Sequence, residues 1–106
     1  MQIARVCGTV VSTQKLRSMT GKKMLMLQLI DREGKDLPQY EVAVDNVGAG
    51  IGEWVLVSRR AIAPDPQGDE RPPIDALVVG IIDTVSVEDG LLYSKREESR
   101  YRLGGR

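Results

Sequence analysis

Three glycines at alternate positions, Gly48, Gly50 and Gly52, are the part of this sequence that most resembles a ligand-binding motif. A glycine-rich loop binds phosphates when it follows a strand and opens a helix, as in the dinucleotide fingerprint G-x-G-x-x-G. The third glycine of that fingerprint would fall at position 53, which is Glu53, and the residues that follow predict a strand. We therefore expect residues 47–52 to form a tight loop that binds no nucleotide, in which glycine permits turns and close packing.

The other reactive side chains form no recognisable catalytic group. Residues 20–23 read Thr-Gly-Lys-Lys, but a phosphate-binding P-loop would need glycine in place of Leu16 and serine or threonine in place of Lys23. The chain has no histidine, which is the commonest general base and metal ligand. Cys7, the single cysteine, can form neither an internal disulfide nor a cysteine-based zinc site, and we expect it to be a buried small apolar residue of a strand. The sequence thus predicts no enzyme and no cofactor.

Charged side chains cluster in two places. Three acids lie in one turn, where a solvated surface is expected; a weak cation site is the alternative, although their spacing matches no calcium loop. Four basic residues form a second cluster, which we expect to be a solvated loop unless it meets an acidic partner. The acids are Asp31, Glu33 and Asp36; the basic residues are Lys15, Arg17, Lys22 and Lys23.

Length and composition indicate one small soluble domain. The chain has 106 residues, of which 42% are hydrophobic, and its 15 basic and 15 acidic residues cancel. It contains no apolar run of membrane-spanning length and opens without an export signal, so we expect a cytoplasmic protein. A zero net charge is unusual for proteins that bind nucleic acid backbones, and it allows self-association.

The pattern of apolar residues predicts an all-β protein. Gly8 is a candidate bulge, turns are expected at 18–22 and 31–35, and the proline-rich segment 63–73 should be a loop. A short helical turn is expected at 73–76, and Glu88-Asp89-Gly90 should turn a hairpin. We expect a domain spanning 1–95, built as a small five-stranded barrel with a C-terminal hairpin, and a charged, fraying tail at 96–106. The predicted strands cover residues 3–12, 23–30, 40–45, 53–58 and 77–87, followed by 91–94 after the turn.

Several of these strands are apolar on both faces. Residues 24–30, 54–57 and 77–82 lack the alternation expected of a barrel with one face in water. Such surfaces usually mark protein contacts, so the sequence favours an oligomer. The alternative is that the helical turn, the proline loop and the tail cover these faces. On the second strand, Leu27 and Leu29 are the candidate interface residues, and a position in the barrel core is the alternative for each side chain.

Three segments, in order, resemble the EutN/CcmL family of bacterial microcompartment vertex proteins. They are residues 9–28, with Thr9-Val-Val-Ser-Thr-Gln-Lys15 and Gly21 ahead of Lys23-Met-Leu-Met-Leu-Gln28; residues 42–53; and residues 75–85. The resemblance implies an OB-like barrel, assembled into a homopentamer with a narrow axial pore. It also implies that the pentamer caps the fivefold vertices of a microcompartment shell, beside other shell proteins that form hexameric tiles.

Two alternatives remain at the level of the sequence. The first concerns the glycine loop, which either contacts another subunit or the pore, or is an ordinary exposed turn within one subunit. The candidate subunit-contact or pore loop consists of Val47, Gly48, Ala49, Gly50, Ile51 and Gly52. The rival function is a nucleic-acid-binding OB domain, which would stack bases on aromatic side chains in a positive groove. The aromatic residues are Tyr40, Trp54, Tyr93 and Tyr101 only, and there is no basic excess, so we expect no nucleic acid or membrane partner.

Overall fold

Strands make up most of the part of the protein that the computed structural model describes, residues 1–59 and 74–96. Strands form at every predicted place, with two corrections. The expected strand 40–45 begins earlier, at Asp36, and the expected strand 77–87 is two strands, because the chain breaks at Ile82 and Asp83. No helical turn forms at 74–76, where β5 begins; the observed 3-10 turn is η1, in the expected 18–22 connection. The predicted loop 63–73 lies outside the described residues. The elements are β1 Gln2–Val10, η1 Arg17–Met19, β2 Met24–Ile30, β3 Asp36–Asp45, β4 Trp54–Arg59, β5 Ala76–Ile81, β6 Thr84–Val87 and β7 Gly90–Ser94.

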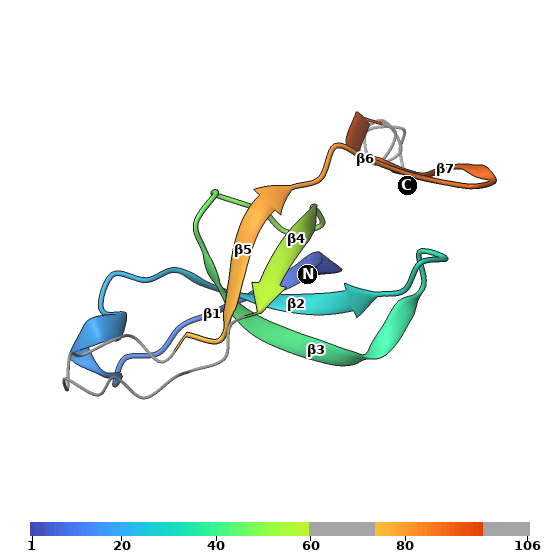
Figure 1. Ribbon diagram of the computed structural model, residues 1–106. Helices are drawn as coiled ribbons and strands as arrows, with labels where there is room; N and C mark the ends of the chain where they lie inside the picture. The colour runs from blue at the N-terminus through green and yellow to red at the C-terminus, as the bar shows by residue number, and fades with distance from the viewer. Residues whose placement is uncertain (60–73, 97–106) are drawn as a thin grey trace, which may run out of the picture.

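The first five strands form a closed barrel, as predicted, and their order around it is β1-β2-β3-β5-β4 (Figure 1). Four of the five contacts between neighbouring strands are antiparallel. The fifth, between β3 and β5, is parallel and consists of two residue pairs, Val44 with Leu77 and Asp45 with Val78. The barrel is therefore closed by a short seam.

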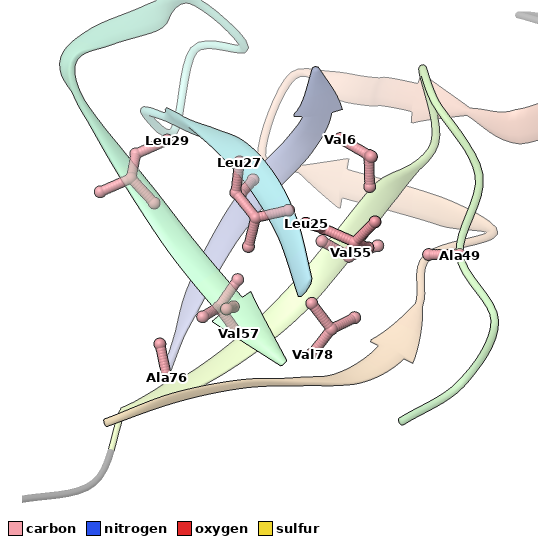
Figure 2. Close-up of a cluster of buried hydrophobic side chains, with 11 residues drawn as sticks. Val6, Leu25, Leu27, Leu29, Ala49, Val55, Val57, Ala76 and Val78 are labelled. Carbon is pink, nitrogen blue, oxygen red and sulfur yellow. The ribbon is translucent and has the colours of Figure 1, made fainter. Parts of the chain in front are cut away.

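Alternate residues of each strand fill the barrel with small and branched apolar side chains (Figure 2). On β2, Leu25, Leu27 and Leu29 are buried in this core, while Met24, Met26 and Gln28 point outward. The expectation that Leu27 and Leu29 lie at a subunit interface is thus wrong for these side chains. The sequence could not distinguish the two faces because Leu and Met are both apolar.

The predicted bulge at Gly8 is confirmed, since the pairing of β1 with β2 shifts between Val6 and Gly8. Cys7 lies at this shift and is exposed, so the expectation that it is buried is wrong. Its Sγ donates to the carbonyl oxygen of Met26 at 3.4 Å. The exposure follows from alternation, because Ala4 and Val6 point inward and Cys7 therefore points outward.

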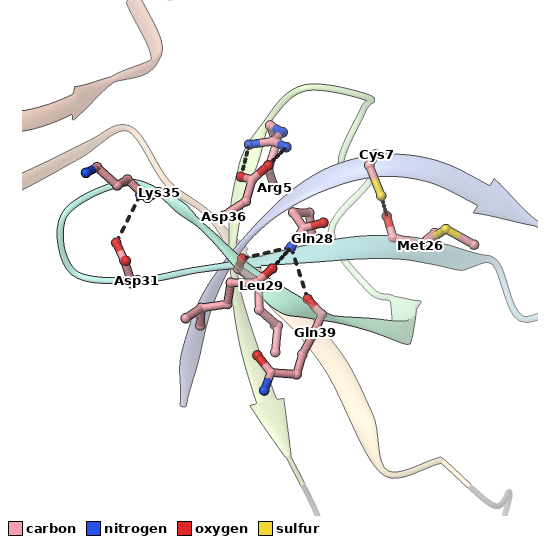
Figure 3. A network of polar contacts seen from close by, with 10 residues as sticks. Arg5, Cys7, Met26, Gln28, Leu29, Asp31, Lys35, Asp36 and Gln39 are labelled. Atoms are coloured by element: carbon pink, nitrogen blue, oxygen red, sulfur yellow. Dashed lines mark hydrogen bonds and ion pairs between the residues drawn. The ribbon is translucent and has the colours of Figure 1, made fainter.

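A polar network holds the start of β3 against β2 (Figure 3). The pairing of β2 with β3 shifts between Gln28 and Ile30, opposite a stretch that contains Pro38, which has no backbone N–H to donate. The Gln28 side-chain amide reaches across this stretch and donates to the carbonyl oxygens of Leu37 at 2.6 Å and Gln39 at 3.0 Å. Gln28 thus supplies hydrogen bonds where the strand ladder is interrupted.

Two of the three clustered acids, Asp31 and Asp36, have structural roles. Asp31 Oδ1 accepts the backbone N–H groups of Glu33 and Lys35, which closes the 31–35 turn as predicted. Asp36 pairs with the Arg5 guanidinium through two hydrogen bonds of 2.8 and 3.0 Å, which lowers the pKa of its carboxyl group. Within residues 1–59 and 74–96, no group of three potential ligands is placed to hold a metal ion.

The hairpin of β6 and β7 extends beyond the barrel and forms the predicted turn at 88–90 (Figure 1). Its base covers the outer surface of β4: the rings of Trp54 and Tyr93 stack with centroids 4.2 Å apart and an interplanar angle of 12°. Ile30 and Ile82 complete this second apolar cluster. Part of the outer apolar surface is therefore covered within the chain, by the hairpin.

Candidate subunit-contact loop and its surroundings

Asp45, at the end of β3, organises the first half of the glycine loop 46–53. Its side chain is 1% exposed. Oδ1 accepts the backbone N–H groups of Val47 at 3.0 Å and Gly48 at 3.1 Å, and Oδ2 accepts that of Ala49 at 3.1 Å. Lys23 lies 3.5 Å away on the exposed side. The carboxylate therefore occupies the position that an anionic ligand would take in a phosphate-binding loop.

Glu53 and β1 hold the second half of the loop. Gly50 donates its N–H to Glu53 Oε1 at 2.6 Å, and Gly52 donates to the carbonyl oxygen of Val6 at 2.8 Å. The N–H groups of Asn46 and Glu53 donate to the carbonyl oxygens of Val78 and Gly50, so seven N–H groups of the loop have partners within the chain. Two of the accepting groups are negatively charged carboxylates. This arrangement supports the expectation that the loop is no phosphate site.

Two of the three glycines are required by backbone conformation. Gly48 has φ +79° and Gly52 has φ +90°, the left-handed region that other residues adopt only at a cost. Gly50 is not among the residues with positive φ. A Cβ added to Gly50 would lie 3.4 Å from Glu53 Oε1, which is near ordinary van der Waals contact. The alternate spacing of the glycines therefore does not reflect one shared requirement.

The three side chains among the six candidate loop residues, those of Val47, Ala49 and Ile51, point in different directions. Ala49 is buried in the barrel core and cannot contact a neighbouring subunit. Val47 and Ile51 are exposed, and Ile51 retains 63% of its accessible surface. Any contact made by this loop would therefore involve Val47 and Ile51, with the glycines and Ala49 fixing their positions.

Gly48→Ala should destabilise the protein, by roughly 1–2 kcal/mol, because alanine must enter the left-handed region. No atom lies within 4 Å of the added Cβ, so the cost would be conformational rather than steric. Gly50→Ala is the matched control and should change the free energy of unfolding by less than about 1 kcal/mol. Urea unfolding of both variants would test this. Equal losses of unfolding free energy in Gly48→Ala and Gly50→Ala would show that the backbone angle φ does not distinguish the two positions.

Lys95, which follows β7, joins the hairpin to the glycine loop. Its Nζ lies 2.7 Å from Glu53 Oε2, while the other oxygen of Glu53 accepts the Gly50 N–H. The hydrogen bond to Glu53 and the charge of that carboxylate raise the pKa of Lys95. The backbone N–H of Lys95 also donates to the carbonyl oxygen of Asp83 at 2.8 Å. One side chain thus connects the end of the hairpin with the loop.

Truncation should distinguish the hairpin from the tail. Ending the chain after Arg96 should leave stability and assembly unchanged. Ending it after Val87 removes Tyr93 and Lys95 and uncovers Trp54. This truncation should lower the free energy of unfolding by roughly 3 kcal/mol or more, comparable to deleting a buried aromatic side chain. Thermal unfolding and native mass spectrometry of both forms would measure the effects. Equal behaviour of the two truncations would contradict the role assigned to β7.

The outer face of β2 and β3, together with η1, carries a partly exposed apolar surface that no other described part of the chain covers; we call it the methionine stripe, and it consists of Met19, Met24, Met26 and Val42. Met26 and Val42 are directly paired across the strands and are 36% and 39% exposed. Gly8 of β1 lies opposite Met26 and has no side chain to cover it. Val42 lies on the outward face of β3, since its neighbour Ala43 points into the core. The apolar outer surface expected of β2 therefore exists, but its residues are the methionines.

The residues that shape the loop were not singled out by the sequence. Asp45 and Glu53 were assigned no role, although an aspartate directly before a turn often accepts backbone N–H groups in this way, and that signal was available. Lys95 was assigned to the charged end of the chain, and no sequence pattern links it to Glu53. The contact depends on how the hairpin folds back.

Within the described residues, no helix is long and apolar enough to cross a lipid bilayer. The described aromatic residues also form no open stacking surface, because Trp54 and Tyr93 stack on each other and only Tyr40 is exposed. Tyr101 lies outside the described residues. The described part of the protein thus has three main surface features: the closed glycine loop, the protruding hairpin and the methionine stripe.

Comparison with known proteins gives one consistent result. The chain is 61% identical over 100 residues to the carboxysome shell vertex protein CcmL of Gloeobacter violaceus, covering 94% of this chain and all of that protein. It is 37% identical to the microcompartment shell vertex protein EutN of Escherichia coli K12, covering 90% of this chain and all of the relative. These relatives are named as shell vertex proteins, in agreement with the expectation of a structural protein rather than an enzyme.

Solved structures agree with the sequence comparison. The structure of Gloeobacter violaceus CcmL superposes with a TM-score of 0.80 at 62% identity, over 91% of this chain and 99% of that chain. GrpN, a pentameric microcompartment shell protein from Rhodospirillum rubrum, gives a TM-score of 0.70 at 40% identity, over 82% and 98% of the two chains. Residues 1–83 match the family described as ethanolamine utilisation protein EutN/carboxysome. The chain therefore belongs to the EutN/CcmL family.

Proposed function

We infer that this protein is a structural shell component that forms pentamers and caps the fivefold vertices of a bacterial microcompartment. The observation that carries this inference is the family match over residues 1–83, together with vertex-protein relatives that the chain covers along their whole length. A relative of known structure is itself described as a pentameric shell protein. The closed barrel, the exposed side chains of Met26 and Val42 in the methionine stripe, and the zero net charge support a protein that assembles with copies of itself.

We further propose the carboxysome as the type of compartment. The chain is 61% identical to a carboxysome vertex protein and 37% identical to EutN of Escherichia coli. In this proposal a barrel-and-hairpin domain at 1–95 lies in a shell inside the cytoplasm, beside hexameric shell proteins, and binds neither nucleic acid nor membranes. Cofactors play no part in it.

We propose that the glycine loop faces a neighbouring subunit or the axial pore. Support comes from the exposed side chains of Val47 and Ile51, which a rigid loop holds in place. Ile51→Asp is the direct test because it changes only an exposed side chain. A folded variant with fewer pentamers would support the proposal, whereas an unchanged pentamer of wild-type thermal stability would show that the loop is an ordinary turn.

Native mass spectrometry tests the main inference. The protein should have a mass five times that of the 11.7 kDa chain, and it should not shift single-stranded DNA at moderate salt. A monomer that binds single-stranded DNA would contradict the shell function and favour the OB-domain alternative. Co-expression with the other shell proteins of its host should then produce closed particles only when this chain is present.

A further inference from the structure

The tip of the β6–β7 hairpin is an apolar and acidic projection. Val87 and Leu91 flank the turn and are 39% and 59% exposed. Between them stand Glu88 and Asp89. A two-stranded hairpin gains little stability alone, and this one packs on the barrel at its base, through Tyr93. The tip lines a hollow of about 740 Å³ together with Arg32 and Glu33 of the 31–35 turn, and it presents two apolar side chains and two carboxylates at this end of the subunit.

The methionine stripe has the complementary properties. Beside it lies a hollow of about 220 Å³, whose lining includes Met19, Met24, Val42 and Ile74. The segment from η1 to β2 carries Arg17 and Lys22 next to these methionines in the chain, while Lys23 is paired with Asp45. Methionine side chains adapt readily to a partner surface. One carboxylate, Asp75, also lines the hollow, so an acidic partner would orient its charges toward Arg17 and Lys22.

We propose that the hairpin tip of one subunit docks on the methionine stripe of a second copy of this chain. Within one subunit the tip and η1 lie at opposite ends of the molecule, so the contact cannot form inside a single chain (Figure 1). A contact between two different surfaces is head-to-tail, and repeated contacts of this kind close into a ring when the rotation allows it. The apolar residues of the tip meet the stripe, and Glu88 and Asp89 face Arg17 and Lys22. This inference rests on the proposed pentamer and names the surfaces that build it.

Charge reversal tests the pairing. A tip variant, Glu88→Lys with Asp89→Lys, and a stripe variant, Arg17→Glu with Lys22→Glu, should each reduce the pentamer fraction at low salt by about tenfold or more, because like charges would face each other. All four substitutions in one chain should restore pentamers. Circular dichroism and thermal unfolding would verify that each variant is folded. Should a reversed variant not fold, Glu88→Gln with Asp89→Asn should weaken assembly and reduce its dependence on salt.

Mixing the two variants gives a sharper result. In a mixture, matched contacts require the two chains to alternate, and a ring of five members cannot alternate without at least one mismatch. The mixture should therefore form fewer pentamers than the chain that carries all four substitutions.

The outcomes separate this inference from the proposed function. A wild-type protein that is not pentameric would overturn both. A pentameric wild type whose reversed variants remain pentameric would overturn the tip-to-stripe contact alone. Loss of pentamers in both variants without recovery in the fourfold variant would also overturn it, because the two surfaces would then have partners other than each other.

Discussion

Leu27→Asp should abolish folding of the subunit, whereas Met26→Asp, one position away on β2, should leave the barrel folded and weaken its assembly. Leu27 is fully buried in the barrel core. Truncating a core leucine costs about 2–5 kcal/mol, and a carboxylate in its place adds the cost of a buried, unpaired charge. Because small domains are stable by only about 5–15 kcal/mol, this loss is comparable to the whole stability.

Met26 provides the matched control, since it receives the same substitution on the same strand but points outward. Far-ultraviolet circular dichroism should show a folded barrel for Met26→Asp and an unfolded or insoluble product for Leu27→Asp. Native mass spectrometry should then show fewer pentamers for Met26→Asp. A soluble, folded monomer from Leu27→Asp would place that side chain at an interface and contradict the assignment of the two faces of β2.

Asp45→Ala is expected to produce the second large effect: it should lower the free energy of unfolding by roughly 3 kcal/mol or more. The substitution removes the acceptor of three backbone N–H groups, those of Val47, Gly48 and Ala49. Hydrogen bonds to a charged group contribute about 1.5–3 kcal/mol each, and the loss is smaller than their sum because water can reach an opened loop. Lys23 should matter little, because its ammonium group is largely exposed.

Asp45→Asn is the matched control, because asparagine has nearly the same shape as aspartate but carries an NH₂ group in place of one oxygen. The amide oxygen can replace Oδ1 for Val47 and Gly48, but its NH₂ group would face the Ala49 N–H, and two donors cannot bond. The free energy of unfolding from urea titrations should therefore rank wild type, Asp45→Asn and Asp45→Ala in decreasing order. An alanine variant as stable as wild type would show that the loop holds its shape without the carboxylate.

The barrel could be predicted from the sequence because its strands and turns use local signals. The bulge at Gly8, the turn at 31–35 and the Asp89-Gly90 hairpin all formed as predicted. The break between β5 and β6 was missed, since residues 77–82 and 84–87 are both rich in branched residues. Cys7 was misplaced because its residue type was given more weight than its position in the alternation.

The surfaces were harder to predict than the strands. A run such as Met-Leu-Met-Leu shows that both faces are apolar but not which face is inside, and this caused the misassignment of Leu27 and Leu29. The glycine loop was located correctly in the sequence, yet the contacts of Asp45 and Lys95 depend on strands distant in the chain. The position of a symmetry axis is a property of several chains, so no pattern within one chain specifies it.

The short seam between β3 and β5 has a consequence for how the barrel can fail. Two residue pairs close it, supplemented by a hydrogen bond of 3.4 Å from the Asn46 N–H to the carbonyl oxygen of Val78. Local opening should begin there, so amide hydrogens of this region should exchange sooner than those of the long β1–β2 ladder. Opening the seam converts the barrel into a sheet with two free edges, along β3 and β5, and free edges are templates for pairing with other chains. The few residue pairs of this seam thus separate a barrel without free edges from an open sheet that can pair with further strands and aggregate.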